Sequence, residues 1–259
     1  MDEVPLKRER PRRRERRRAR LSPLTVIGEL LILGGLATFG YIVWQPWHTG
    51  VTVLHKQLEL TAADAELYDA QALMRPAFTG EVPVPDAPPI GQVFGTLHVP
   101  AFGTTFANRV AEGTGWWETL NYDDKGIGHY PKSAMPGKPG NFAIAAHRSG
   151  SFITPFKEIM NLRIGDPLFF ETADGWYTYR FRSLEYVLPD ERNVLYPFPR
   201  LDGAPGEDQI LTLTTCHPKA YGDDERAIAY AIFEGFQPRS DGPPAELLEL
   251  NPALKGASS

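Results

Sequence analysis

Apolar and polar residues are spaced as in β-strands over much of residues 91–237. The stretch WYTYRFRSLEYV, residues 176–187, alternates in the way a half-buried strand requires. Further strands are predicted by short apolar runs between Gly and Pro: FGTLHVP (94–100), NFAIAAH (141–147), PLFFET (167–172), QILTLTTC (209–216) and RAIAYAIF (226–233). Helical patterns here are short, at 115–124 and 153–162. The pattern predicts an all-β barrel with small helices.

The N-terminal region has a different pattern. From Leu24 to Trp44, a run of 21 residues, the only formal charge is Glu29, and a helix of this length crosses the hydrocarbon core of a membrane. A cleaved signal peptide would have a shorter apolar core that ends in small residues. This run is long and ends in Tyr-Ile-Val-Trp-Gln-Pro-Trp, residues 41–47. We therefore expect an uncleaved transmembrane signal anchor.

Charge is divided unevenly along the chain. Residues 1–45 carry ten basic and five acidic side chains, and the remainder carries 17 basic and 27 acidic ones. A basic tail can bind nucleic acid, but directly before a membrane span topology and anionic lipid explain it. The basic end is expected in the cytoplasm of a single-pass cell-membrane protein, with the rest extracellular. The acidic remainder argues against a nucleic-acid partner.

The connecting segments are also readable. Residues 48–74 are mostly helix formers, with Leu54 and Leu58 on one face, and residues 75–91 are rich in Pro. The chain is expected to have five parts: a cytoplasmic basic tail (1–22), the transmembrane signal anchor (23–45), a stalk helix and Pro-rich linker (46–90), the globular domain (91–237) and a loose C-terminal tail with at most a turn of helix (238–259).

Cys216 is the only cysteine of the chain. Structural cysteines outside the membrane occur in pairs, so a single one is an inert buried thiol, an intermolecular bridge or a nucleophile. No CxxC, HxH or HExxH spacing occurs, which argues against a metal site because zinc needs three or four ligands. Export favours the nucleophile, since an idle extracellular thiol is exposed to oxidation.

A thiol nucleophile needs a proton-transfer partner and a group that stabilises the oxyanion. His147 ends one strand-like run, as Cys216 ends another, and Arg226 begins the next run after a hairpin-sized gap. Pairing of those runs would bring Cys216 and Arg226 together. Each residue alone is a weak signal, because a His or Arg at a strand end is often only a solvated edge residue. Together they are the candidate catalytic residues.

Several segments resemble sortases, the cysteine transpeptidases of Gram-positive bacteria. TLTTC (212–216) is similar to the TLxTC signature of that family. NFAIAAHRSG resembles the segment of the catalytic histidine, and DERAIAYA resembles the strand of the catalytic arginine. GTLHVPAFG and TPFKEIMNLRIGDPLFFET are similar to other family segments, in the right order, so the resemblance covers nearly all of 91–237. GIGHYPKSAMPGKPGNFAIAAHR and TCHP look most like class E, the housekeeping type of high-GC actinobacteria.

The resemblance implies a closed eight-stranded β-barrel and a thiol-dependent transpeptidase that needs no cofactor. Cys216 would form a thioester with the Thr of an LAxTG- or LPxTG-type sorting signal, His147 would move the protons, and Arg226 would stabilise the oxyanion. Secreted proteins would then be joined to the cross-bridge amine of lipid II or peptidoglycan. Some class A sortases use calcium, but no acidic cluster here suggests a site for it.

The resemblance also suggests substrate-binding residues. Tyr130, His129 and Thr215 are expected in the signal pocket. Class A sortases can have a small residue at the position of Tyr130, which leaves room for the proline of LPxTG, so a tyrosine there would favour LAxTG. In the simpler interpretation, Tyr130 is a packing residue in a turn between His129 and Pro131.

Two other functions remain possible at the level of sequence. An exported cysteine peptidase or amidase of another fold usually has its Cys before its His, near a helix N-terminus, whereas His147 precedes Cys216 here. A non-catalytic barrel that binds wall peptides would be favoured if Cys216 were buried and far from His147.

Overall fold

The structure is a computed structural model that describes residues 22–149, 153–219 and 223–256. The chain forms two compact units, residues 1–45 and residues 46–259. The helix α1, Pro23–Ala72, begins in the first unit and ends in the second. Its large apolar side chains between Leu24 and Trp44 are exposed, and the helix is long and apolar enough to cross a membrane. This agrees with the predicted membrane-spanning helix.

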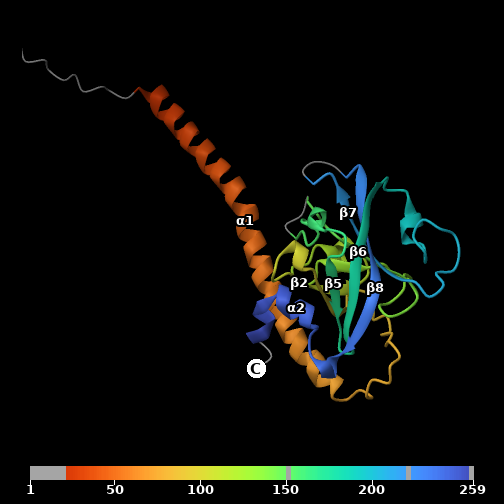
Figure 1. The fold of residues 1–259 in the computed structure, drawn as a ribbon. Helices are drawn as coiled ribbons and strands as arrows, with labels where there is room; N and C mark the ends of the chain where they lie inside the picture. The colour runs from red at the N-terminus through yellow and green to blue at the C-terminus, as the bar shows by residue number, and fades with distance from the viewer. Residues whose placement is uncertain (1–21, 150–152, 220–222, 257–259) are drawn as a thin grey trace, which may run out of the picture. The chain divides into compact units, whose positions relative to one another are not determined.

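The second unit contains a closed β-barrel of eight strands (Figure 1). The strands are β1 Val93–His98, β2 Ala107–Glu112, β3 Ile127–His129, β4 Gly140–Ala146, β5 Pro167–Glu171, β6 Gly175–Val187, β7 Gln209–His217 and β8 Glu225–Pro238. Their order around the barrel is β1-β2-β3-β4-β7-β8-β6-β5, and β5 pairs with β1 to close it. The pairs β2–β3 and β4–β7 are parallel. The predicted all-β class and the eight-stranded closed barrel are confirmed.

Short one-turn helices interrupt the loops. They are η1 Pro100–Phe102, η2 Trp116–Leu120, η3 Ile159–Asn161 and η4 Arg192–Leu195. Two of them, η2 and η3, fall within the predicted helical stretches 115–124 and 153–162. The element η2 is a single π-helical turn that precedes β3, and it brings its residues to the candidate site described below.

Side chains of β4 and β7, the strands that lead to the candidate site, alternate between the barrel core and the outer face. In β7, Leu211 and Leu213 lie in the main core cluster, whereas the hydroxyl of Thr212 donates to Asn141 Oδ1 at 2.6 Å. Because side chains alternate along a strand, Thr212, Thr214 and Cys216 share the outer face. The same alternation puts Phe142 and Ile144 of β4 in the core cluster.

The C-terminal part of α1 is docked on the barrel instead of standing free. Its buried residues are Gln57, Thr61, Asp64 and Tyr68, a polar stripe at helical spacing, while Leu54 is exposed. The carboxylate of Asp64 accepts from Arg109 Nε at 2.7 Å, and Gln57 Nε2 donates to the Asp123 carbonyl at 2.7 Å. The stalk helix is therefore held by polar contacts with β2 and the loop after it. A face built on Leu54 and Leu58 does not hold it.

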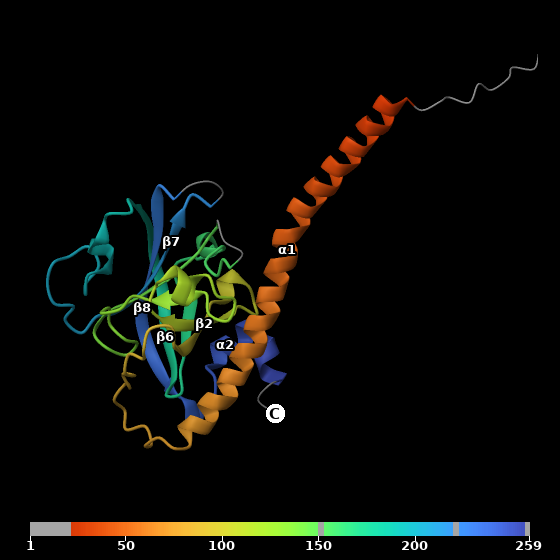
Figure 2. The same cartoon turned by 180° about the vertical axis from the view of Figure 1, so that it is seen from behind.

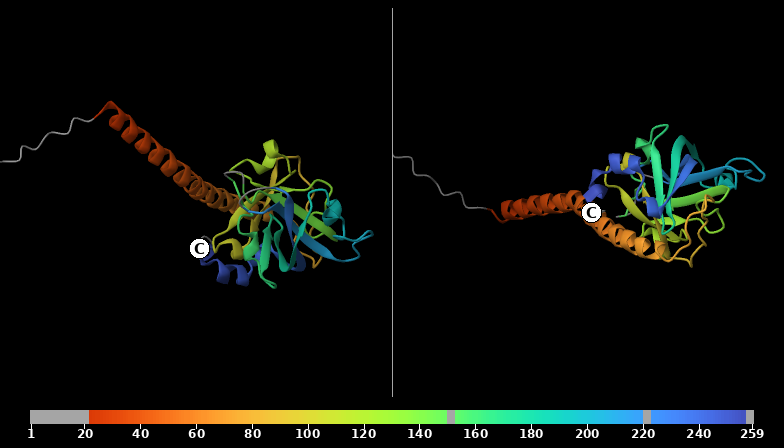
Figure 3. Two further views of the ribbon diagram at one scale, coloured as in Figure 1. Left: turned by 90° about the horizontal axis from the view of Figure 1, so that it is seen from above. Right: turned by 60° about the horizontal axis from the view of Figure 1, so that its bottom comes forward.

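In the described part of the C-terminal tail, the predicted turn of helix is present, but the tail is packed on the barrel and is not loose. The tail forms η5 Arg239–Asp241, α2 Ala245–Leu250 and η6 Pro252–Gly256, on the outside of the barrel (Figures 2 and 3). Leu247 is 1% exposed and packs with Phe169 and Trp176. Burial of these apolar side chains stabilises the segment. Residues 257–259 lie outside the described part of the chain.

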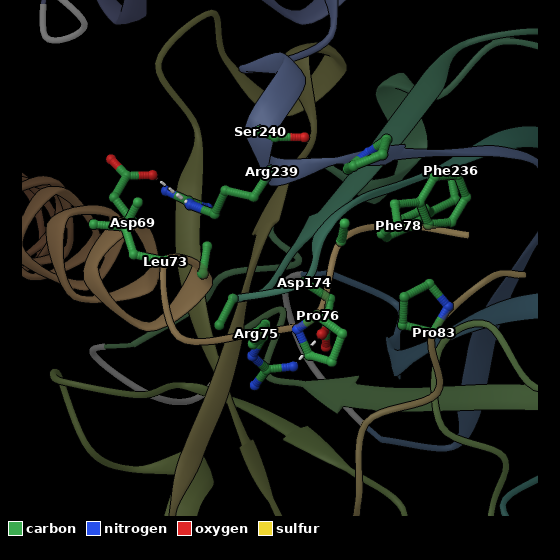
Figure 4. A pocket seen from close by; sticks show the side chains of 14 residues that line it. Asp69, Leu73, Arg75, Pro76, Phe78, Pro83, Asp174, Phe236, Arg239 and Ser240 are labelled. Atoms are coloured by element: carbon green, nitrogen blue, oxygen red, sulfur yellow. Dashed lines mark hydrogen bonds and ion pairs between the residues drawn. The ribbon is translucent and has the colours of Figure 1, made fainter. Parts of the chain in front are cut away.

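Arg239 connects the tail, the barrel and the end of α1. Its guanidinium pairs with Glu171 at 2.7 Å and with Asp69 at 2.5 Å. Beside it is a cavity of about 310 Å³, on whose wall Arg75 pairs with Asp174 (Figure 4). The linker that follows α1 also contacts the barrel, because the Tyr177 hydroxyl donates to the Pro83 carbonyl at 2.8 Å. The linker is thus held at this end of the barrel.

Candidate active site

The only cysteine lies near the end of β7, directly opposite Arg226 of β8. The register of this antiparallel pair gives Cys216↔Arg226 and His217↔Glu225. Directly opposed residues have Cβ atoms about 4.5–5.5 Å apart, so the hairpin brings a thiol and a guanidinium together on the outer face. Cys216 is half-buried. The pairing that the sequence suggested is therefore present.

Arg226 is held at the start of its strand by backbone carbonyls. Its Nη1 donates to the Asp223 carbonyl at 2.6 Å and to the Glu225 carbonyl at 2.9 Å. Among the described residues, no carboxylate forms an ion pair with it. The guanidinium is thus oriented by neutral acceptors and keeps its charge available for a ligand.

His147 follows β4, on the other side of β7. The strands β4 and β7 are parallel, with Ala145 opposite Thr214, and Thr215 Oγ1 donates to the Ala146 carbonyl at 2.7 Å. Continuing this register by two residues puts His147 beside Cys216. The three candidate residues therefore come from three adjacent strands, β4, β7 and β8, at one end of the barrel.

The imidazole of His147 is fixed by two residues near η2. Its Nε2 is 3.0 Å from Asn121 Oδ1, and because an amide oxygen only accepts, this bond puts a proton on Nε2. The ring of Trp116 packs edge-on against it, with 5.6 Å between ring centroids. Burial lowers the pKa of His147 below the ordinary value of 6.5. The imidazole is therefore neutral at neutral pH and can accept a proton.

Tyr130 also lies on the outer face, close to the thiol and the guanidinium. Its hydroxyl is 2.9 Å from Thr214 Oγ1, and Thr214 precedes Cys216 by two residues. Burial raises the pKa of Tyr130, while the hydrogen bond to Thr214 and the charge of Arg226 oppose that rise. The tyrosine therefore stands where a ligand bound along β7 would meet it.

The structure does not bring His129 to this face, which corrects the expectation that it binds substrate. It is 1% exposed inside the barrel, where Nδ1 is 2.6 Å from Glu112 Oε2 and Phe94 and Phe142 pack against its ring. The reason is that side chains alternate along extended backbone, so the neighbours His129 and Tyr130 point to opposite faces. A peptide on the outside cannot reach it.

Thr215 is corrected for the same reason. It follows Leu213 on the inner face, is 4% exposed, and uses its hydroxyl on the Ala146 carbonyl. The threonine that shares the face of Cys216 is Thr214. Period-two alternation in TLTTC could have indicated this, whereas no local pattern marks Asn121 or Trp116, which reach His147 from a distant loop.

The loop between β6 and β7 forms a wall beside this face. Asn141 Nδ2 donates to the carbonyls of Val194 and Tyr196, at 3.0 and 3.1 Å. Val187, Val194 and Ile228 form a small apolar cluster beneath the loop. The outer face of β4, β7 and β8 is therefore bounded by a fixed wall on one side and carries the thiol at its end.

Comparisons with known proteins agree with this geometry. A model of the sortase domain matches residues 97–233. Sortase SrtE1 of Streptomyces coelicolor is 32% identical over 229 residues, which are 86% of this chain and 60% of SrtE1. Sortase SrtE2 of the same organism is 34% identical over 207 residues, 75% of this chain and 76% of SrtE2. A crystal structure of Sortase E1 from S. coelicolor, with a tripeptide in the active site, has a TM-score of 0.54 at 34% identity and covers 61% of this chain and 97% of that one.

The chain belongs to the sortase family of transpeptidases. Within that family its likeness is to class E, represented by SrtE1 and SrtE2. The chain spans about three fifths of the length of SrtE1, since the match covers 60% of it. A cysteine peptidase of another fold is excluded, because the barrel is the sortase fold.

Proposed function

We propose that the chain is a membrane-anchored cysteine transpeptidase, with Cys216, His147 and Arg226 as its catalytic residues. It cleaves an LAxTG- or LPxTG-type signal between Thr and Gly and joins the cleaved protein to an amine of the cell wall. One observation carries the proposal: Cys216 lies directly opposite Arg226, and His147 directly follows the parallel strand β4 on the other side.

In the first step, the sulfur of Cys216 attacks the Thr carbonyl carbon. The neutral imidazole of His147 takes the thiol proton and gives it to the nitrogen of the departing glycine. The C–N bond breaks as the C–S bond persists, which leaves a thioester on Cys216 and a free amine on the glycine fragment. The lowered pKa of His147 supports its role as the proton acceptor.

Arg226 stabilises the negative charge that develops on the carbonyl oxygen. Its guanidinium carries a permanent charge and lies opposite the sulfur, so it costs little reorganisation when the tetrahedral intermediate forms. The planar fork also suits the substrate backbone. The two backbone carbonyls that accept from Nη1 fix its direction.

In the second step, an amine attacks the thioester. His147 accepts the proton of the incoming amine, the C–S bond breaks, and the thiol of Cys216 takes up a proton again. The acceptor is an amine of peptidoglycan or of its lipid-linked precursor, lipid II. The predicted anchor at residues 23–45 supports this assignment. An enzyme on the extracellular face of the cell membrane meets both exported proteins and a lipid-linked acceptor.

Tyr130 is assigned to recognition of the second signal residue. The Tyr130 ring is half-buried and its hydroxyl is hydrogen-bonded to Thr214, on the face where the signal would lie. A fixed ring there leaves less room for proline than for alanine, which supports a preference for LAxTG.

The reaction is tested by incubating the full-length chain in detergent with an LAxTG peptide and an amine. Mass spectrometry should find the fragment up to Thr joined to the amine and the released fragment that begins with Gly. Cleavage at another bond, or release of the Thr fragment as a free acid under all amine concentrations, would contradict the proposal.

A further inference from the structure

A cavity of about 550 Å³ lies beside α1, and its other walls include residues 148–149, 153–155 and 157–158. Its walls include Val51 and Leu54 of α1 and the rings of Phe102 and Phe106. The basic side chains Arg148, Lys157 and Lys219 also line it, against a single acid, Glu158. This volume is typical of a site for a small ligand.

Arg148 is the unusual residue of this cavity. It is 5% exposed, and within the described part of the chain no carboxylate forms an ion pair with it. Its Nη1 donates to His217 Nδ1 at 2.8 Å, while its Nε has no hydrogen-bond partner among the described residues. A buried charge without a counter-charge is costly, so an anionic ligand would stabilise Arg148.

The surrounding charge also favours an anion. Three basic lining residues against one acid leave an excess of two positive charges, and Glu158 is itself paired with Lys219 at 3.2 Å. Residues 46–259 as a whole carry 17 basic and 27 acidic side chains. The positive charge of the cavity is therefore not explained by the overall composition of residues 46–259, which is acidic.

The cavity is joined to the candidate catalytic residues through the strands themselves. Arg148 follows His147, and its partner His217 follows Cys216. Because neighbours on a strand point to opposite faces, His217 of β7 faces away from the proposed signal groove, and its hydrogen bond with Arg148 puts that guanidinium on the same side. Cys216, His147 and Arg226 do not line the cavity, so a ligand held by Arg148 has to extend around the ends of β4 and β7 to reach the sulfur of Cys216.

We propose that this cavity holds the amine acceptor, with Arg148 binding a carboxylate of that acceptor. The inference rests on the proposed function. A planar guanidinium matches a carboxylate in a two-bond fork, and a peptide of the cell wall carries carboxylates at short distances from its amines. The apolar wall from α1 and the phenylalanines accommodates the rest of the ligand.

The test compares two acceptors that differ only in charge, triglycine and triglycinamide. Calorimetric titration of the full-length chain in detergent should show triglycine binding at least about tenfold more tightly, since hydrogen bonds between charged groups are the strong ones. Arg148→Gln should abolish this advantage. Arg182→Gln, a change at an exposed arginine of β6, should keep it. Equal binding of the two acceptors by the unaltered chain would overturn the inference.

Kinetics supply a second arm that does not depend on the stability of any variant. N-acetyl-glycylglycine has the carboxylate but no amine, so it should compete with the acceptor and not with the sorting peptide. Competition with the sorting peptide would assign the cavity to the signal. Stronger inhibition by inorganic phosphate than by this peptide would assign it to a phosphorylated ligand. Either result contradicts the inference.

The two proposals fail in different ways. If a thioester forms on Cys216 but acceptors are not distinguished by charge, only the assignment of the cavity is wrong. If no thioester forms, the proposed function itself is wrong.

Discussion

Cys216 and Arg226 are directly opposed across the β7–β8 pair. This relationship depends on register, because a slip of one residue would turn one of the two side chains toward the core. The antiparallel pairing runs without a shift from Ile210↔Ile232 to His217↔Glu225. The position of the thiol is therefore set by the barrel and not by the loop between the strands.

Replacement of the thiol should separate catalysis from folding. Cys216→Ala is expected to abolish peptide ligation, while the free energy of unfolding changes by less than about 1 kcal/mol, because the side chain is only half-buried at a strand end. Denaturant unfolding and a ligation assay on the same preparation measure both. An alanine variant that still ligates would show that another group is the nucleophile.

Replacement of Arg226 by lysine should show whether the planar guanidinium is needed in addition to its charge. Arg226→Lys keeps the charge but loses the planar fork, and we expect kcat/KM to fall about 10²–10³-fold. The matched control is Arg182→Lys, at an exposed position of β6, which should be near normal. A lysine variant at residue 226 with near-normal kcat/KM would remove this arginine from the mechanism.

The imidazole should titrate below its ordinary range. Burial lowers the pKa of His147, so its ring should become protonated below pH 6.5, as followed by NMR. Trp116→Ala uncovers the ring and should move this pKa upward, because the desolvation that disfavours the charged form is reduced. Trp117→Ala is the control, since Trp117 is 77% exposed.

The sign of the stability effect follows from the same shift. The unfolded chain binds a proton at His147 at higher pH than the folded chain does, so this residue makes folding less favourable as pH falls through 6.5 toward the folded value. Trp116→Ala should reduce that loss. A His147 pKa at or above 6.5 in the unaltered protein would contradict the structural account.

The second position of the signal should be read by Tyr130. Tyr130→Ala is expected to lower turnover of an LAxTG peptide and to narrow its advantage over LPxTG, by about 1–3 kcal/mol of discrimination. Tyr130→Phe keeps the ring and loses only the bond to Thr214, so it should keep most of the advantage. An unchanged ratio of the two rates in the alanine variant would exclude this role.

Orientation in the membrane can be tested on intact cells. Protease added outside should degrade or release residues 46–259 and leave the Arg-rich residues 1–22 protected, because positive charge is retained on the cytoplasmic side. Rupture of the membrane should expose the tail as a control. Protection of the barrel in intact cells would reverse the predicted orientation.

The sequence predicted most of the barrel because six strands have apolar runs long enough to recognise. It did not predict β2 or β3, for physical reasons. The strand β2 contains Asn108 and Arg109, and its polarity is compensated by contacts such as Arg109 with Asp64 of α1. The strand β3 has three residues, Ile127–His129, too few for a periodic pattern.

The sequence predicted the candidate site residues that lie at strand ends. It did not predict which face of a strand the other site residues occupy. Cys216 and Arg226 could be paired from their spacing alone. Assigning His129 and Thr215 to the signal pocket required knowing which face each one occupies, and that depends on register in the closed barrel. The partners of His147 could not be found, because Trp116 and Asn121 come from a loop whose place is set by tertiary packing.

In the proposed reaction, Cys216 forms a thioester with the Thr of a sorting signal. The most direct measurement is the intact mass of the full-length chain after brief mixing with an LAxTG peptide and no added amine. We expect an added mass equal to the peptide through Thr less one water, located on Cys216 by proteolytic mapping and released by hydroxylamine. The absence of an adduct while the peptide is being cleaved, or an adduct on any other residue, would contradict it.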